Sequence, residues 1–281
     1  MFRLSEKKTR LSGAWKELLP RCDRPECNAN SGWTGVLHRS TGIRLNDVEW
    51  FCTPACLEEA LQESLRECFM HDDLSEPIRT HMPLGLMMLA RGVISDAELR
   101  SALKMQHQTG ERIGACLLRM GCISAEDIAS VVATQWGCPV FPQDSVHPAC
   151  SMLLPYSLAE RYRMIPVHLV PLGRRLFVGF CEKVNHSALI ATEKILGCAT
   201  EACVIPEPKF KHILDSRKLD TTGEVTVLRP RSAVESAKII RNYAQQTAAE
   251  SLRLQAIGGN IWARFFVRGT HLDLIFEQLT L

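Results

Sequence analysis

Four cysteines near the N-terminus have the residue type and the spacing of a metal site. Four residues separate the first pair, three separate the second, and 24 residues lie between the pairs. Two close pairs of thiolates joined by a loop suit a closed tetrahedral zinc site, which is structural because no position is left for a substrate. Four separately buried cysteines are the alternative. We predict structural zinc held by Cys22, Cys27, Cys52 and Cys56.

The segments around these cysteines have the turns and ends that such a site needs. The first pair lies in a turn-rich stretch, and the second lies where a strand at 48–51 runs into a helix opening with Thr53-Pro54. A thiolate near a helix N-terminus is favoured in its charged, metal-binding form. Residues 1–70 resemble treble-clef-like zinc modules with four cysteine ligands. So short a segment buries too little apolar surface to fold well alone, which favours a structural role for the metal.

Two glutamines in the middle of the chain end apolar stripes in the same way. Leu99, Leu103 and Gln106 fall at i, i+4 and i+7, and so share one face of a helix. The same pattern recurs 29 residues later, ending at Gln135. Two stacked helical hairpins whose glutamines are satisfied by backbone would explain the pattern without any ligand. A polar residue at the same place in both stripes also suits a wall that receives a ligand.

These stripes belong to a tandem repeat over residues 83–135. Each copy has 24 residues, and five residues separate the copies. We expect a short helix, a glycine stop and a longer helix in each copy. Ser95 with Glu98, and Ser124 with Asp127, form capping boxes that start the longer helices.

The repeat resembles the MshEN domain, which stands at the N-terminus of many type II secretion and type IV pilus assembly ATPases. That domain carries Arg-Leu-Gly, then Leu, Gly, Leu, Leu and Gln at fixed spacing, written twice. The first copy here supplies Leu84, Gly85, Met88, Gly92, Leu99, Leu103 and Gln106. The second supplies Arg112, Ile113, Gly114, Leu117, Gly121, Ile128, Val132 and Gln135. The resemblance implies that these residues bind cyclic di-GMP, each copy taking about half of the dinucleotide.

Met, Ile or Val replaces several leucines of the family pattern and keeps the apolar bulk, whereas two other departures change polar groups. Pro83 stands where the first copy should carry arginine, so that half lacks a charge-assisted contact. Its loss weakens binding by about 1.5–3 kcal/mol. After the second strand of the α/β half the family commonly has Asp-Pro, and this chain has Glu182-Lys183. Glu182 is therefore a candidate ligand residue by resemblance, and a surface salt bridge is its alternative role.

The resemblance extends over residues 78–216, with an α/β half at 153–216, where we expect Ser187 to cap a helix that Gly197 ends. Beyond a polar linker, residues 231–281 read as a helix and a three-stranded antiparallel unit with hairpin turns. Trp262, Arg264, Phe266 and Arg268 share one strand face. That stripe could bind nucleic acid, or it could be ordinary alternation on a half-covered sheet. The predicted fold class is α+β and multi-domain: a zinc module, a tandem helical-hairpin repeat joined to a small α/β subdomain, and a C-terminal helix with antiparallel sheet.

Composition limits the functions that this chain can have. Thirty-three Lys and Arg balance 31 Asp and Glu, which argues against a nucleic-acid binder with a broad basic face. Neither a membrane-length apolar run nor a signal core is present, so we expect a cytoplasmic protein. No G-x-x-x-x-G-K-[ST] loop occurs, and an enzyme is not expected.

We therefore predict a cyclic di-GMP receptor or adaptor without ATPase activity, which signals to a protein partner such as secretion or pilus machinery. Two alternatives remain open. One is a protein-interaction scaffold whose nucleotide motif has decayed. The other is a zinc-containing regulator that binds nucleic acid.

Overall fold

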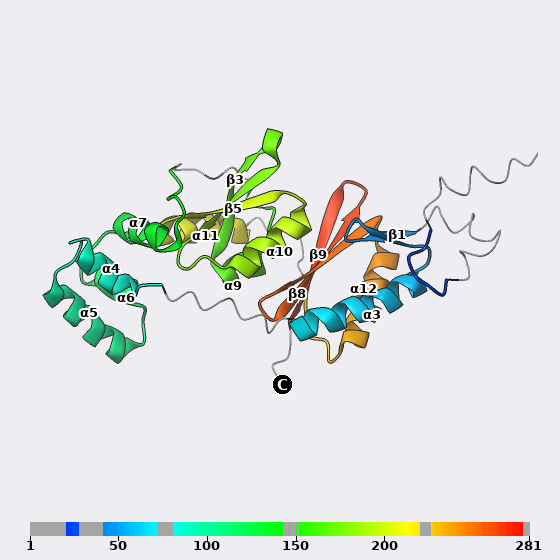
Figure 1. The fold of residues 1–281 in the computed structure, drawn as a ribbon, viewed down its shortest axis with the longest axis horizontal. Helices are drawn as coiled ribbons and strands as arrows, with labels where there is room; N and C mark the ends of the chain where they lie inside the picture. Colours follow the sequence, from blue (N-terminus) through cyan, green and yellow to red (C-terminus); the bar gives the residue numbers. More distant parts are fainter. Residues whose placement is uncertain are drawn as a thin grey trace, which may run out of the picture. The chain divides into compact units, whose positions relative to one another are not determined.

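The chain folds into two compact units, each of which is described by itself. In the computed structural model, the described residues are 21–27, 42–71, 81–142, 146, 150, 152–219 and 226–277. Unit 1 joins residues 1–70 to 228–254 and 261–281, and unit 2 comprises 71–227 and 255–260. Among the described residues, no helix is long and apolar enough to cross a bilayer. The α+β class expected from the sequence is confirmed (Figure 1).

Unit 1 is built on a six-stranded sheet in the order β2-β1-β7-β8-β9-β6. Its strands are β1 (Ile43–Leu45), β2 (Glu49–Phe51), β6 (Thr226–Leu228), β7 (Ser251–Ile257), β8 (Asn260–Val267) and β9 (Thr270–Glu277). The turns joining β7 to β8 and β8 to β9 each hold two residues at positive φ, as type I′ hairpin turns require. The hairpins expected at the C-terminal end of the chain are therefore present.

Helices α3 (Pro54–His71) and α12 (Ala233–Gln246) pack on this sheet. Leu57, Leu61 and Leu65 follow one face of α3 and are completely buried in a core that also holds Ile240 of α12. An ion pair of 2.7 Å between Arg241 and Glu58 joins the two helices. Apolar residues from both ends of the sequence therefore share one core.

The sheet unites two segments that the sequence analysis treated as separate modules, 1–70 and 231–281. Strand β1 pairs antiparallel with β2 and parallel with β7, where Arg44 lies opposite Ser251 and Leu45 opposite Leu252. The amide of Asn46 donates to the carbonyl of Leu252 at 2.8 Å. The N-terminal hairpin thus extends the C-terminal sheet, because its short strands find in β7 the partner that a hairpin alone lacks.

Unit 2 begins with the repeat. Its helices are α4 (Leu84–Ala90), α5 (Asp96–Thr109), α6 (Ile113–Arg119) and α7 (Ala125–Trp136). Each copy forms a short helix followed by a longer one, and Met88 and Leu117 are both completely buried in the one core that the two copies share. The tandem hairpins predicted from the 29-residue offset are therefore confirmed.

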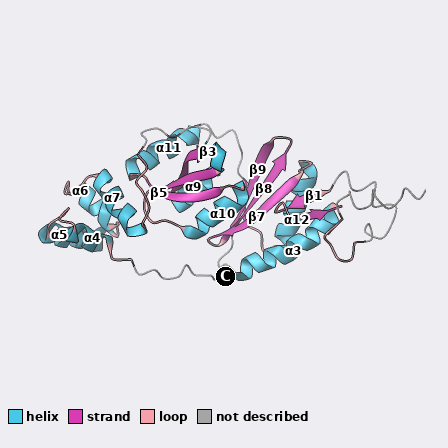
Figure 2. Cartoon of the chain, turned by 45° about the horizontal axis from the view of Figure 1, so that its top comes forward, coloured by secondary structure: helices cyan, strands magenta, loops and turns pink. Residues whose placement is uncertain are grey.

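A three-stranded sheet in the order β3-β4-β5 completes unit 2. Its elements are α9 (Tyr156–Tyr162), β3 (Met164–Val170), the 3-10 turn η2 (Pro171–Gly173), β4 (Arg175–Phe180), α10 (His186–Leu196), β5 (Ala199–Val204) and α11 (Glu207–Leu219). Strands β3 and β4 are antiparallel, and β4 and β5 are parallel, joined by the crossover helix α10. Helices α9 and α11 share a core with β3 through Ala159, Phe210 and Leu214. Figure 2 draws these helices in cyan and the strands of the sheet in magenta.

Local details of the α/β half differ from the expectation. Asn185, rather than Ser187, caps α10, since its side chain accepts the amide of Ala188 at 2.9 Å. Helix α11 was not anticipated, although Phe210, Leu214 and Arg217 bury one helical face. The stretch expected as a linker from 217 onward contains the end of α11 and strand β6.

Candidate functional site

The two copies of the repeat have the same local structure at equivalent positions. Gly92 and Gly121 end the short helices in the left-handed region, with φ of 68° and 71°. Ser95 and Ser124 each accept an amide three residues on, and the acid at that position accepts the serine amide. The duplication seen in the sequence is therefore a duplication of structure.

The residues preceding the short helices also match in conformation. Pro83 has φ −51° and ψ 136°, and Arg112 has φ −73° and ψ 149°. The carbonyl of each accepts the amide four residues later. The backbone conformation is thus shared, and the copies differ in the side chain and in the backbone N–H that proline lacks.

A cavity of about 720 Å³ lies between the second copy and the α/β half, within the range of small-molecule sites. The second copy and its flanks supply Glu111, Arg112, Ile113, Gly114, Ala115, Leu118, Ala125, Ile128, Ala129, Val132, Gln135 and Trp136. The α/β half supplies Cys181, Glu182, Lys183, Ile205, Pro206 and Glu207, and the first copy supplies Leu84 and Gln106. Apolar side chains form most of the wall, and Arg112, Glu182 and Glu207, which ion pairs connect, form what we call its charged side.

Nine of the sequence-predicted ligand residues line this cavity. They are Leu84, Gln106, Arg112, Ile113, Gly114, Ile128, Val132, Gln135 and Glu182. They come from both copies and from the loop after β4. Their juxtaposition is what a shared ligand site requires, and their role as ligand contacts stays a prediction.

Seven predicted residues lie outside the cavity wall. Leu99, Met88 and Leu117 are buried in the core of the repeat. Gly92 and Gly121 hold left-handed helix ends, with open space where a Cβ would stand. Gly85 lets α4 approach Leu99, and Leu103 is 48% exposed. Several motif positions therefore serve the packing of the hairpins.

Gln135 makes the backbone contact that the alternative without a ligand expects of a motif glutamine. The Gln135 amide donates to the carbonyl of Met82 at 2.8 Å and so holds the segment that leads into α4. Next to it, the ring of Trp136 lies 4.2 Å from that of His81 and 6.1 Å from that of His186. One end of α7 thus gathers an amide and an aromatic ring at the cavity.

A chain of ion pairs runs along the charged side of the cavity. Arg112 pairs with Glu182, which also lies 3.2 Å from the Nε of Arg163. Arg163 and Lys211 each contact Glu207 at 2.9 Å. Burial alone would raise the pKa of Glu207, but Lys211 and Arg163 outweigh it and lower that pKa below its ordinary value. Glu182 therefore both lines the cavity and forms the ion pair considered as its alternative role.

Sequence reasoning missed the rest of the charged side. Arg163 adopts the left-handed conformation at the end of α9, and Glu207 opens α11 after Pro206. Pro206 followed by Glu207 has the sequence pattern of a helix start, but no feature of the neighbouring sequence indicates that Glu207 lies near the repeat. Cys181 was also missed, and burial raises the pKa of its thiol to about 11, so it stays protonated at neutral pH.

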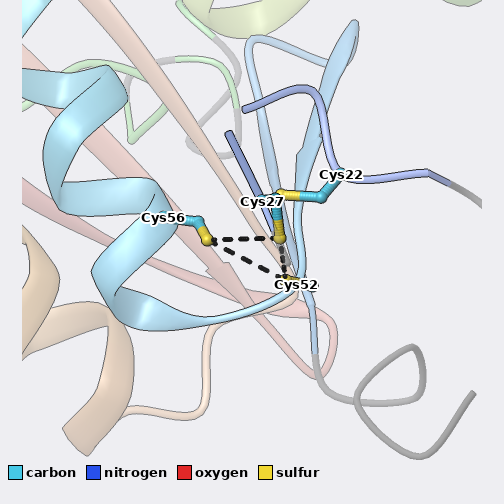
Figure 3. Close-up of side chains that lie close together, drawn as sticks. All are labelled: Cys22, Cys27, Cys52 and Cys56. Carbon is cyan, nitrogen blue, oxygen red and sulfur yellow. Dashed lines mark hydrogen bonds between the residues drawn. The ribbon is translucent and has the colours of Figure 1, made fainter. Parts of the chain in front are cut away.

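The four N-terminal cysteines form a second cluster (Figure 3). Their sulfur atoms all lie within 4.8 Å of one another. Cys27 Sγ lies 3.4 Å from Cys52 Sγ and 3.8 Å from Cys56 Sγ, and Cys52 Sγ lies 3.9 Å from Cys56 Sγ. Four sulfurs about 2.3 Å from one tetrahedral ion would stand about 3.8 Å apart. The cluster thus has the size and the donor set to hold a metal ion.

The elements around this cluster place its sulfurs as the sequence predicted. The stretch at 21–27 is fixed to β2 by two hydrogen bonds between Asp23 and Trp50, of 2.9 and 2.6 Å. Cys52 follows β2, and Cys56 lies in the first turn of α3. Burial raises the pKa of Cys56, yet hydrogen bonds from Thr53 and Arg24 leave that pKa lowered. One thiol is thereby prepared to bind as thiolate.

The aromatic-basic stripe on β8 is internally paired. Arg264 donates to both carboxylate oxygens of Asp273, at 2.8 and 2.7 Å, and the Trp262 indole donates to the same carboxylate at 2.8 Å. Both side chains are buried. A neutralised arginine offers little to a phosphate backbone, so the pairing favours ordinary sheet packing over nucleic-acid binding.

Comparison with known proteins relates part of the chain to secretion and pilus ATPases. It is 27% identical over 134 residues to the type IV pilus assembly ATPase PilB of Myxococcus xanthus, covering 47% of this chain and 23% of that protein. It is 32% identical over 133 residues to PilB of Thermus thermophilus, covering 47% and 15%. Together with the repeat, these similarities decide the relationship. The chain contains an MshEN-like domain.

Two further comparisons cover a similar share of this chain. The chain is 31% identical over 121 residues to the bacteriophage adsorption protein B of Escherichia coli K12, covering 42% of this chain and 16% of that protein. The solved structure of MshE with cdg (cyclic di-GMP) has a TM-score of 0.40 at 25% identity, covering 48% of this chain and 98% of that one. No protein-family model matches the chain. The chain spans less than a quarter of the length of the PilB proteins that it matches.

Proposed function

We propose that this chain binds cyclic di-GMP in the cavity between the second copy of the repeat and the α/β half. The observation that carries the proposal is the convergence of Arg112, Gly114, Ile128, Val132 and Gln135 on one cavity. Sequence similarity to PilB and the solved structure of MshE with cyclic di-GMP support the choice of ligand. Both copies of the motif contribute to the cavity wall.

The chemistry of the cavity suits a guanine nucleotide. Ile113, Ile128 and Val132 provide a flat apolar wall for a base, and Arg112 provides a planar cation for a phosphate. Guanine presents N–H donors on its Watson–Crick edge, which a carboxylate such as Glu182 can accept. A phosphate that binds Arg112 would replace Glu182 as the partner of that arginine.

Variants of Arg112 test the proposal. Cyclic di-GMP should raise the melting temperature of the intact chain. Arg112→Ala should raise the half-saturating concentration of cyclic di-GMP by about ten- to a hundredfold, because a charge-assisted contact is lost. Gln135→Ala should also weaken the binding of cyclic di-GMP. Arg100→Ala is the matched control, since Arg100 lies on α5 with only an exposed ion pair to Asp96. Equal responses of Arg112→Ala and Arg100→Ala would refute the site.

We further propose that the cysteine cluster binds structural zinc. Four buried cysteines on one knuckle and one strand-to-helix turn match the ligands that zinc takes in closed sites. Metal analysis of the purified chain should find zinc, which Cys52→Ser should lose. A metal-free chain with its fold intact would contradict this assignment.

We also propose that ligand binding is passed to a protein partner, without ATP hydrolysis by this chain. The 281 residues contain no phosphate-binding G-x-x-x-x-G-K-[ST] loop. Such signalling requires cyclic di-GMP to bind two conformations with different affinity. Hydrogen exchange with and without ligand tests this part: altered protection outside the cavity supports it, and protection confined to the cavity wall counts against it.

A further inference from the structure

The cavity is built unequally from the two copies of the repeat. The second copy supplies most of the wall, including the arginine, the glycine and the glutamine of its motif. Of the first copy, all of whose residues the structure describes, only Leu84 and Gln106 line the cavity. A ligand with two equivalent halves would therefore meet two different surfaces.

The motif glycines show the same inequality. A Cβ added at Gly85 would stand 2.7 Å from Cδ1 of Leu99, so side-chain packing already fills the space beside this glycine. A Cβ at Gly114 would stand 3.6 Å from Cδ1 of Ile128, an ordinary contact, and Gly114 lines the cavity. At this glycine position, close approach of a ligand to the backbone is therefore open in the second copy and blocked by Leu99 in the first.

The apolar stripes differ in the same direction. Leu103 is 48% exposed, whereas the equivalent Val132 is 4% exposed beneath the α/β half. Pro83 adds neither charge nor an N–H donor at the position where Arg112 offers both. Each of these contrasts weakens the first half of the site.

We propose that the site holds one guanylate unit, a guanine with its phosphate, and leaves the second unit of a dinucleotide largely outside the cavity. This inference rests on the proposed function. The site should then bind any compound that presents a single guanylate, and the cyclic linkage should add little to the affinity. Linear pGpG and GMP should then bind within about tenfold of cyclic di-GMP.

Titration calorimetry of the intact chain with cyclic di-GMP, pGpG and GMP tests the proposal. Similar affinities for the three ligands support it. Cyclic di-GMP binding more than about a hundredfold tighter than both others would overturn it, because both halves would then be held. Failure of all three ligands to bind would refute the proposed function itself, a separate outcome.

Pro83→Arg provides a gain-of-binding test. The backbone at Pro83 matches that at Arg112, so arginine fits there without strain. The variant should bind cyclic di-GMP about tenfold or more tightly while GMP binding stays unchanged, because only a dinucleotide can reach both arginines. Pro83→Ala is the matched control and should leave the ratio of the affinities for cyclic di-GMP and GMP unchanged. A Pro83→Arg variant that folds and shows no gain for cyclic di-GMP would contradict the proposal.

Discussion

The charged residues at the cavity form ion pairs with one another. The family resemblance indicated Arg112 and Glu182, but it did not show that they pair with each other. Arg163 and Glu207 extend this chain of charges, and they come from the ends of α9 and α11. No short-range pattern in the sequence joins residues so far apart. Residue types at the site were therefore predictable, whereas the electrostatic network was not.

The lowered pKa of Glu207 leads to a pH-dependent stability. A carboxyl with a folded-state pKa below its unfolded value stabilises the fold above the unfolded value and loses that contribution as pH falls through the folded pKa. Glu207→Gln should therefore be less stable than the natural chain at neutral pH, and the difference should vanish well below pH 4.5, the ordinary value. Urea unfolding of both chains at neutral pH and well below pH 4.5 measures this difference in stability. An equal difference at both would contradict the pairing with Lys211 and Arg163.

At the scale of elements, the repeat was predictable because its signals are local. Glycine stops and serine capping boxes fix the ends of α4 to α7 wherever they occur. The cap of α10 was misassigned because Asn185 and Ser187 are both good caps, and only backbone geometry separates them. Which motif glycine faces the cavity depends on neighbouring helices, so the sequence could not show it.

Two glycine variants separate packing from binding. Gly114→Ala adds a methyl group that fits beside Ile128, and alanine favours helix by about 0.5–1 kcal/mol, so stability should hold or rise. The methyl group lies in the cavity wall, so cyclic di-GMP binding should weaken. Gly85→Ala should instead lower the melting temperature, because Leu99 must move. Thermal melting and ligand titration of both variants check this; a Gly114→Ala chain that binds normally would exclude its backbone from the site.

At the scale of the whole molecule, the two ends of the chain depend on each other. Strand β1 has three residues and pairs with β7, about 200 residues later in the sequence. Such pairing leaves no periodic signal, and so the shared sheet could not be foreseen. The cysteines belong to the same core as Leu252 and Phe265 of that sheet.

This shared core predicts that metal removal affects the C-terminal strands. Chelation, or Cys52→Ser, should lower the melting temperature and speed amide exchange in β7, because the knuckle, β1 and α3 lose their anchor. A fragment of residues 1–70 should fail to fold even with zinc, since α12 and β7 complete its core. Unchanged exchange in β7 after complete metal removal would show that the two parts are independent.

Calorimetric titration of the intact chain with cyclic di-GMP is the most direct test of the central claim, that the second copy of the repeat and the α/β half form a nucleotide site. We predict saturable binding to the natural chain, much weaker binding to Arg112→Ala, and tighter binding to Pro83→Arg. Absence of binding at high micromolar ligand, to a chain with the expected secondary structure, would contradict the claim.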